Sequence, residues 1–339
     1  MHVLLADRYG AQHLLQPVLT ENPDAFLAIG DDDVVQRIWG REQGMPSKST
    51  LADILRSQIE AHRTEIFYNL DPLRYGSGFL RTLPGSVRYR IGWRAAPSPG
   101  ADFQGYDLMV CNFPSILEQY RAQGLRAAYF APAFDPEMMP YAANTDRPVD
   151  VAFVGGFTRH HIRRTQILTS IAGLSEENNI AIHLESSRFT KLAESQLGSW
   201  FLSAKYRRPE ILRKVARGPV FGRELYEVLS TAKIVVNAAI DMAGDDRGNI
   251  RCFETMGTGA LLLSDLGNYP DGMRDRSTIR TYSDPADLVQ TVLKLLADPA
   301  ETAAIAARGH ALVTTRYSKD RQWSDFLKLI DGQNSGRMQ

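Results

Sequence analysis

Residues 244–265 read GDDRGNIRCFETMGTGALLLSD, and this stretch holds the clearest structural pattern in the chain. A polar loop that contains glycine leads into apolar residues at helical spacing, Ile250, Phe253 and Met256. Glycines at positions 257 and 259 stop the helix, and the apolar run 260–263 follows as a strand. This order of loop, helix and buried strand predicts a parallel α/β sheet.

The first turn of the predicted helix suits an anionic ligand. A helix N-terminus leaves its first amides unbonded and carries about half a positive charge. Arg251 and Glu254 lie three residues apart, on one helical face. An arginine suits a diphosphate, and a carboxylate accepts hydrogen bonds from a ribose diol. The alternative for these two residues is an ordinary surface ion pair.

The pattern N-x-R-x-F-E-x-x-G-x-G-A-x-x-L-x-D begins at Asn249 and resembles the nucleotide-sugar motif of group 1 glycosyltransferases with the two-domain GT-B fold. It is most similar to the spore-maturation-like branch of that superfamily. The resemblance implies that Glu254 binds the ribose hydroxyls. It also implies that the helix start at Asn249 and Ile250, together with Arg251, holds the diphosphate.

The resemblance covers residues 149–321 and assigns two further residues to the donor site. Retaining relatives carry Glu-x7-Glu, whereas Asp246 and Glu254 give this chain Asp-x7-Glu, which assigns the shorter Asp246 to the sugar. In GT-B proteins the loop at 218–223 lies near the nucleobase, so Phe221 becomes a candidate wall for the base. As a bare aromatic residue, Phe221 would instead be assigned to the core.

Composition narrows the class of protein. The 339 residues contain 39 Lys plus Arg and 39 Asp plus Glu, so the net charge favours neither nucleic acid nor an anionic membrane. Residues 1–150 carry 14 basic and 18 acidic side chains, and residues 151–339 carry 25 and 21, a weak bias that suits an anionic ligand in the second half. Cys111 and Cys252 form no CxxC pair, and no apolar run approaches about 18 residues. We expect a cytoplasmic protein without disulfides or structural zinc.

Strands alternate with helices along the chain, which predicts two doubly wound Rossmann-like domains facing a cleft. Apolar runs at 2–6, 64–70, 87–93, 106–111 and 127–130 predict the strands of the first domain, and the proline-rich residues 132–148 predict a linker. The expected divisions are an acceptor-side domain 1–145, a nucleotide-sugar domain 149–317, and a C-terminal helix and tail 318–339 that crosses back to the first domain.

The first predicted strand of the second domain, residues 149–154, is followed by Gly155 and Gly156 and then by a helix with several basic residues. Neither G-x-G-x-x-G nor a Walker lysine follows, which argues against a dinucleotide dehydrogenase or a P-loop enzyme. Arg159 and Arg163 in the first turns oppose the helix dipole, an arrangement that an anion among them would explain. The two glycines and the two arginines are therefore diphosphate candidates, with a solvated basic face as the alternative.

Residues 186–219 contain eight basic and two acidic side chains. A helical insertion of this kind could meet an acceptor, a lipid surface or a second subunit. The alternative is a solvated helical pair whose aromatic residues lie in the core.

The leading functional hypothesis is transfer of a sugar from a nucleotide diphosphate sugar to a hydroxyl acceptor, which could be a glycan, lipid-linked glycan, protein or small molecule. An inverting reaction needs a base at a strand end of the first domain, and Asp71, Asp7 and His13 are the candidates. We expect no metal, because the helix amides and Arg251 neutralise the diphosphate; the acidic run 31–33 is interpreted as a solvated turn. The alternatives are a nucleotide-sugar epimerase or hydrolase, a non-catalytic donor-binding subunit and a dinucleotide oxidoreductase.

Overall fold

The computed structural model describes residues 2–157, 161–195, 207–238 and 243–337. The chain forms two compact units that are discontinuous in sequence. The first unit contains Leu14–Ala131 and Gln322–Gln339, and the second contains His2–His13 and Pro132–Arg321. The structure thus groups residues 2–13 and 132–145 with the second unit, whereas the sequence analysis expected them in the first.

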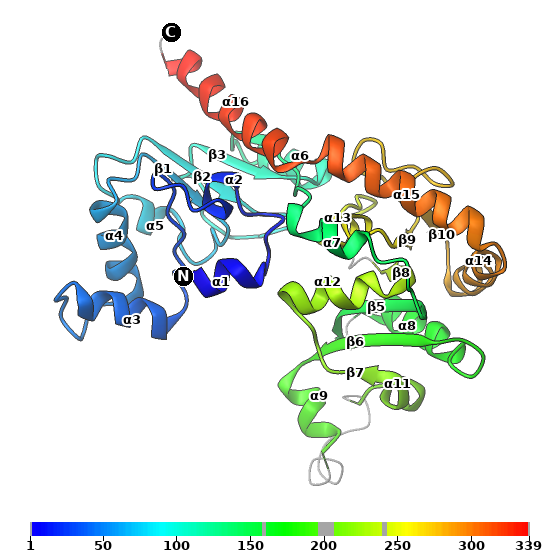
Figure 1. The fold of residues 1–339 in the computed structure, drawn as a ribbon. Coiled ribbons are helices and arrows are strands. Elements are labelled where there is room, and N and C mark those ends of the chain that lie inside the picture. The colour runs from blue at the N-terminus through cyan, green and yellow to red at the C-terminus, as the bar shows by residue number, and fades with distance from the viewer. Residues whose placement is uncertain (1, 158–160, 196–206, 239–242, 338–339) are drawn as a thin grey trace. The chain divides into compact units, whose positions relative to one another are not determined.

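The first unit is built on a four-stranded parallel sheet in the order β1-β2-β3-β4 (Figure 1). Its strands are β1 (Ile66–Asn69), β2 (Tyr89–Trp93), β3 (Leu108–Cys111) and β4 (Ala127–Tyr129). All four residues of β3 are buried, as an apolar central strand of a parallel sheet requires. The predicted strands of this unit from residue 64 onward are confirmed.

Helices and a C-terminal segment complete the first unit. The helices are α2 (Gln16–Leu19), α3 (Asp33–Glu42), α4 (Leu51–Ala61), α5 (Ser77–Leu80) and α6 (Pro114–Ala122). Helix α16 (Lys319–Arg337) begins in the second unit and continues in the first, where Phe326 and Ile330 are buried in the core beside Ile91 and Val110. The expected return of the C-terminal helix to the first domain is confirmed by this packing.

The second unit contains a six-stranded parallel sheet in the order β10-β9-β8-β5-β6-β7. Its strands are β5 (Val149–Phe157), β6 (Ile180–Ser186), β7 (Ala216–Arg217), β8 (Ala232–Asn237), β9 (Leu261–Asp265) and β10 (Arg280–Tyr282). The central strands β8 and β9 are almost wholly buried, and the stretch at 260–263 is part of β9 as predicted. Two parallel-sheet units confirm the expected α/β fold class.

The second unit also contains helices, most of which connect its strands. They are α1 (His2–Asp7), η1 (Pro136–Met138), α7 (Met139–Ala142), α8 (Ile162–Gly173), α9 (Arg188–Ala193), α11 (Glu210–Val215), α12 (Gly222–Ser230), α13 (Ile250–Gly257), α14 (Pro285–Ala297) and α15 (Pro299–Arg316). None of the described helices is long and apolar enough to cross a bilayer.

The prediction of a strand at residues 2–6 is wrong. These residues form helix α1, and none of its side chains is buried. Periodicity cannot distinguish a short apolar run in a strand from one in a helix, and no neighbouring strand pairs with this segment. Residues 158–160, which include the diphosphate candidate Arg159, lie outside the described residues.

Candidate functional site

The strand order places a topological switch point in the second sheet. The chain moves outward from β5 through β6 and β7, and in the opposite direction from β8 through β9 and β10. Arg164 lies at this point: its Nη1 donates to the Gly156 carbonyl at 3.1 Å and its Nε donates to the Ala238 carbonyl at 3.2 Å. Open parallel sheets bind ligands beyond the carboxyl ends of the strands at such a point.

Helix α13 brings the predicted ribose and diphosphate residues to this edge of the sheet. Arg251 Nη1 lies 2.7 Å from Glu254 Oε2, and the two side chains are 16% and 5% exposed. Burial raises the pKa of Glu254, and the charge of Arg251 opposes that shift. The pair is therefore no solvated surface ion pair, because water is largely excluded from both groups.

A layer of amide and hydroxyl groups holds the start of α13. Asn249 precedes the helix, and its Nδ2 donates to Asn237 Oδ1 at 3.1 Å instead of its side chain capping the helix. Asn237, at the end of β8, donates from Nδ2 to Ser264 Oγ on β9 at 3.0 Å. These contacts fix the first turn of α13, where the backbone of Ile250 and Arg251 contributes helix N-terminal amides.

The other end of α13 lies against the connection at residues 134–138. A Cβ at Gly257 would overlap the Met138 sulfur and lie 3.2 Å from the Phe134 ring. Glycine is thus required for close approach of the backbone, not for a special backbone angle. This contact brings the connection next to the motif helix.

A buried tyrosine links α12 to the same connection. Tyr226 on α12 donates to Asp135 Oδ2 at 3.1 Å and accepts from Gln12 Nε2 at 2.8 Å. Burial, Asp135 and the charge of Glu254 all raise the pKa of Tyr226. The neighbouring helices α12 and α13 therefore share one polar layer that reaches from Glu254 to Asp135.

Basic side chains face that layer from two separate segments. Arg8 Nε lies 4.0 Å from Asp135 Oδ2, and the fully buried Asp135 has its pKa raised by burial, against the opposing effect of Arg8. Lys319, 4% exposed, donates from Nζ to the Ala11 carbonyl at 2.7 Å and to the Gln12 carbonyl at 3.2 Å. Burial is the main cause that lowers the pKa of Lys319 to about 7.

No sequence pattern indicated a role for Arg8, Asp135, Tyr226 or Lys319. Each lacks a local motif, because their contacts join segments separated by tens to hundreds of residues. Asp135 lies between two prolines, at positions 132 and 136, in an apparent linker, where an aspartate indicates a turn. Its complete burial is the signal of a further role, and burial is not visible in the sequence.

The strand β5 runs through Gly155 and Gly156, which pair with Leu184 and Glu185 of β6. They therefore belong to the sheet and not to a separate phosphate loop. Arg163 lies on the first turn of α8, where its Nη2 is 3.1 Å from Asp265 Oδ1 and donates to the Ser283 carbonyl at 2.9 Å. Arg159 falls outside the described residues.

The remaining donor candidates lie on loops of the second unit. Asp246 is 8% exposed and forms an isolated parallel bridge with Asn268. Phe221 precedes α12, is 45% exposed and meets Tyr9 edge-on, with ring centroids 5.9 Å apart. The exposure of Phe221 excludes its assignment to the core.

The three candidate bases have different environments. Asp71 follows β1 in the first unit and is exposed; its backbone amide donates to the buried Asn69 at 2.9 Å, and Arg74 Nε lies 3.8 Å from its carboxylate. Asp7 packs against Gly222 at the start of α12 in the second unit. Burial and the charge of Lys319 lower the pKa of His13 to about 3, so its imidazole is neutral at pH 7.

The acidic run at 31–33 has structural partners in the first unit. Asp32 caps α3 by accepting from the Val35 amide at 2.9 Å, and Asp33 pairs with Arg37 at 2.9 Å. These contacts agree with the interpretation of the run as a turn.

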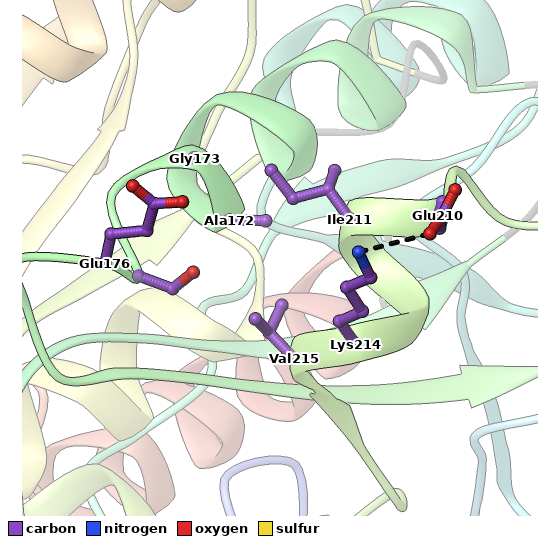
Figure 2. A pocket seen from close by; sticks show the side chains of 8 residues that line it. Ala172, Gly173, Glu176, Glu210, Ile211, Lys214 and Val215 are labelled. Atoms are coloured by element: carbon purple, nitrogen blue, oxygen red, sulfur yellow. Dashed lines mark ion pairs between the residues drawn. The ribbon is translucent and has the colours of Figure 1, made fainter.

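The described part of the basic segment 186–219 contains α9, α11 and the short strand β7. Arg208 pairs with Glu194 through several hydrogen bonds, including one of 3.0 Å from Nε. A pocket of about 390 Å³ lies between the end of α8 and α11. Figure 2 shows the side chains that line it, among them the Lys214–Glu210 ion pair, whose atoms are 3.1 Å apart. Because α8 runs away from the carboxyl ends of the strands, this pocket lies away from the edge where such sheets bind ligands.

One protein family matches this chain in sequence, and the matched residues include α13. Residues 171–328, which include α12, α13 and β9, match the family described as Glycosyl transferase-like. Among curated proteins, none matches the chain by sequence. The spore-maturation-like branch is not distinguished by these comparisons.

Solved structures define the class of fold. A similar fold occurs in Anabaena HepE in complex with UDP, at 11% identity and a TM-score of 0.57, covering 83% of this chain and 82% of that one. Sucrose-phosphate synthase from Thermosynechococcus elongatus shows 14% identity and a TM-score of 0.56, covering 84% and 77%. A glycosyltransferase from Rickettsia africae shows 9% identity and a TM-score of 0.54, covering 87% and 86%. The chain has the GT-B fold, and its residues 171–328 are glycosyl transferase-like in sequence.

Proposed function

We propose that this protein transfers a sugar from a nucleotide diphosphate sugar to a hydroxyl acceptor. The observation that carries the proposal is the Arg251–Glu254 pair on the first turns of α13, in which the carboxylate is buried and the guanidinium is only 16% exposed. Burying charge is costly unless it is paired or used, and sites of chemistry are where such groups concentrate. The glycosyl transferase-like match spans the same helix.

In the proposed complex, Glu254 accepts hydrogen bonds from the ribose hydroxyls. Its pKa is raised by burial, but the charge of Arg251 favours the carboxylate form that accepts such bonds. Arg251 and the first amides of α13 face the diphosphate. Asp246 contacts the sugar, Phe221 borders the base, and Arg163 lies beside the neighbouring strand end.

In the proposed reaction, the bond between the anomeric carbon and the diphosphate oxygen breaks, and the acceptor oxygen bonds to that carbon. The nucleoside diphosphate leaves with the electron pair, and the acceptor proton passes to a base or to solvent. Preorganised amides and a guanidinium stabilise the charge that grows on the leaving diphosphate. We therefore propose that the reaction requires no metal.

If the product is inverted, we propose Asp71 as the base. Its carboxylate is solvent-accessible, and its backbone is held by Asn69, which also donates to the Tyr106 hydroxyl at 2.6 Å. His13 is a poor alternative, because a neutral imidazole whose pKa is about 3 accepts a proton weakly. Asp7 lies against Gly222 at the start of α12, in the second unit, whereas the base is expected in the first.

The test is incubation of the full chain with UDP-, GDP- and dTDP-sugars, with and without a panel of glycan, lipid-linked and small-molecule acceptors. Transfer predicts release of nucleoside diphosphate that depends on acceptor, together with a glycosylated product. Release without acceptor would indicate a hydrolase, and a changed donor sugar would indicate an epimerase. Binding without turnover would indicate a donor-binding subunit.

The basic segment 186–219 remains a proposed contact for a lipid surface or a second subunit. The cytoplasm is the proposed location of the protein.

A further inference from the structure

The segment formed by residues 6–9 lies against the N-terminal end of α12. Arg223 Nε, in the first turn of α12, donates to the Ala6 carbonyl at 2.6 Å. Gly222 has φ +53, and a Cβ at this position would overlap the Asp7 backbone and carboxylate. The absence of a side chain at Gly222 therefore allows the segment to approach the helix closely.

The backbone at Arg8 divides the segment between a charged side and an aromatic side. Arg8 has φ +66, a left-handed conformation that is unfavourable for a residue with a Cβ. Arg8 reaches Glu137, with Nη2 3.3 Å from Oε1, while the next residue, Tyr9, meets Phe221 with an interplanar angle of 69°. Tyr9 is 67% exposed and Phe221 is 45% exposed. Strained backbone of this kind is common at ligand sites.

The charges beside this aromatic pair are already balanced. Glu137 accepts from Arg223 Nη2 at 2.6 Å as well as facing Arg8, and these contacts lower the pKa of Glu137. The carboxylate of Asp7 lies at the start of α12, where a helix dipole favours negative charge. With both arginines and the helix end matched by carboxylates, this corner suits a neutral planar ring better than a phosphate.

The spacing along α12 connects the corner to the ribose candidate. Phe221 and Tyr226 are five residues apart, which corresponds to roughly 7.5 Å along a helix axis. Tyr226 lies close enough to Glu254 for that carboxylate to contribute to the raised pKa of Tyr226, after burial and Asp135. Helix α12 therefore begins at the aromatic pair and carries Tyr226 to the neighbourhood of the ribose candidate.

We propose that Tyr9 and Phe221 form a two-sided aromatic corner that binds the base of the donor nucleotide, with Tyr9 supplied by the N-terminal segment. The inference rests on the proposed donor function and extends it to a residue outside the motif. Aromatic rings bind nucleobases by stacking, which contributes roughly 5- to 100-fold in affinity per base when the ring is removed.

The test compares dissociation constants of the full chain for UDP, GDP, ADP and inorganic pyrophosphate. The variants are Tyr9→Ala, Phe221→Ala, the ring-preserving Tyr9→Phe, and Phe189→Ala, an exposed aromatic of the same unit. For the nucleoside diphosphate that binds best, we expect a loss of roughly 5- to 100-fold in each of the first two variants. Tyr9→Phe and Phe189→Ala should stay within about twofold, and pyrophosphate affinity should not change in any variant.

Two results would overturn the inference in different ways. If the wild type binds a nucleoside diphosphate and Tyr9→Ala and Phe221→Ala bind it with the same affinity, the aromatic corner does not bind the base. The proposed donor function would not be affected by that result. Failure of every nucleoside diphosphate to bind the wild type would remove both proposals. Because both rings are substantially exposed, the alanine variants should keep the wild-type melting temperature, which confirms that affinity and not folding has changed.

Discussion

The two units are similar in architecture but differ in the polar groups that they bury. Among the residues that the structure describes, the charged side chains that are buried all belong to the second unit: Asp135, Asp246, Glu254, Asp265 and Lys319. The buried polar residues of the first unit are neutral, including Gln36, Gln58, Asn69 and Asn112. The candidate carboxylate of the first unit, Asp71, is exposed.

This difference agrees with the proposed division of work between the units, with the donor bound by the second unit and the base supplied by the first. A buried charge costs several kcal/mol unless partners offset it, so five such groups in one unit need a reason beyond stability. Binding of a charged, hydrogen-bonding donor is such a reason. An exposed carboxylate on a neutral scaffold suits a group that exchanges protons with an acceptor and solvent.

Asp71→Asn should produce the largest effect, because it removes the proposed base of the first unit. We expect turnover to fall by about 10²- to 10⁴-fold if the product is inverted, with the affinity for nucleoside diphosphate unchanged. Steady-state kinetics and the anomeric configuration of the product by NMR measure this. Asp24→Asn is the control, an exposed carboxylate of the same unit. Inversion by a fully active Asp71→Asn enzyme would exclude Asp71 from the mechanism.

Glu254→Gln tests the buried charge of the second unit. We expect donor binding to weaken by about 1.5 to 3 kcal/mol, the scale of a hydrogen bond to a charged group. Wild-type affinity should also fall as the pH drops through the raised pKa of Glu254, because the protonated carboxyl loses an acceptor, and this pH dependence should be absent from the variant. Calorimetry against pH measures both. Equal affinities in Glu254→Gln and the exposed control Glu227→Gln would return Glu254 to a structural role.

Lys319 tests whether burial lowers the pKa of a charged side chain in the second unit. In the unfolded chain the pKa of Lys319 is about the ordinary value of 10.5, whereas in the folded chain it is about 7. The unfolded state therefore binds more protons between these values, and stability should rise with pH at up to about 1.4 kcal/mol per unit. The free energy of unfolding is measured in urea from pH 7 to 10. Its rise with pH should be smaller in Lys319→Met than in the exposed control Lys328→Met, which keeps the contribution of Lys319. The same slope in both variants would contradict a lowered pKa.

Chelation should produce the smallest effect. Because Arg251 and the helix amides are proposed to neutralise the diphosphate, transfer should continue at about the same rate in EDTA. Measured turnover that is lost in EDTA and restored by magnesium or manganese would contradict a metal-independent mechanism and direct attention to Asp31, Asp32 and Asp33.

Local patterns in the sequence predicted most of the elements in both sheets. The helix at Ile250 and the strand before Asp265 were predictable because loop, helical spacing and glycine stop agree over one continuous stretch. The Arg251–Glu254 pair was predictable for the same reason, since three residues on a helix determine the contact.

Contacts between distant segments were not predictable. The apolar pattern predicted a strand at residues 2–6, where the structure has α1. The pattern also predicted that Gly155 and Gly156 follow a strand, whereas β5 includes them. The partners of Arg8 and Lys319 lie far away in sequence, so no local rule indicates them. Tertiary packing determines which of these charges are buried, and a single sequence does not report it.

Hydrogen exchange of the full chain with and without saturating UDP tests the division between the units most directly. We expect slower exchange in the amides of α13, in the first turn of α12 and in residues 6–9, with little change in residues 64–131. Glu254→Gln should reduce that protection at a fixed UDP concentration. Protection confined to residues 64–131, with α12 and α13 unchanged, would contradict a donor site in the second unit.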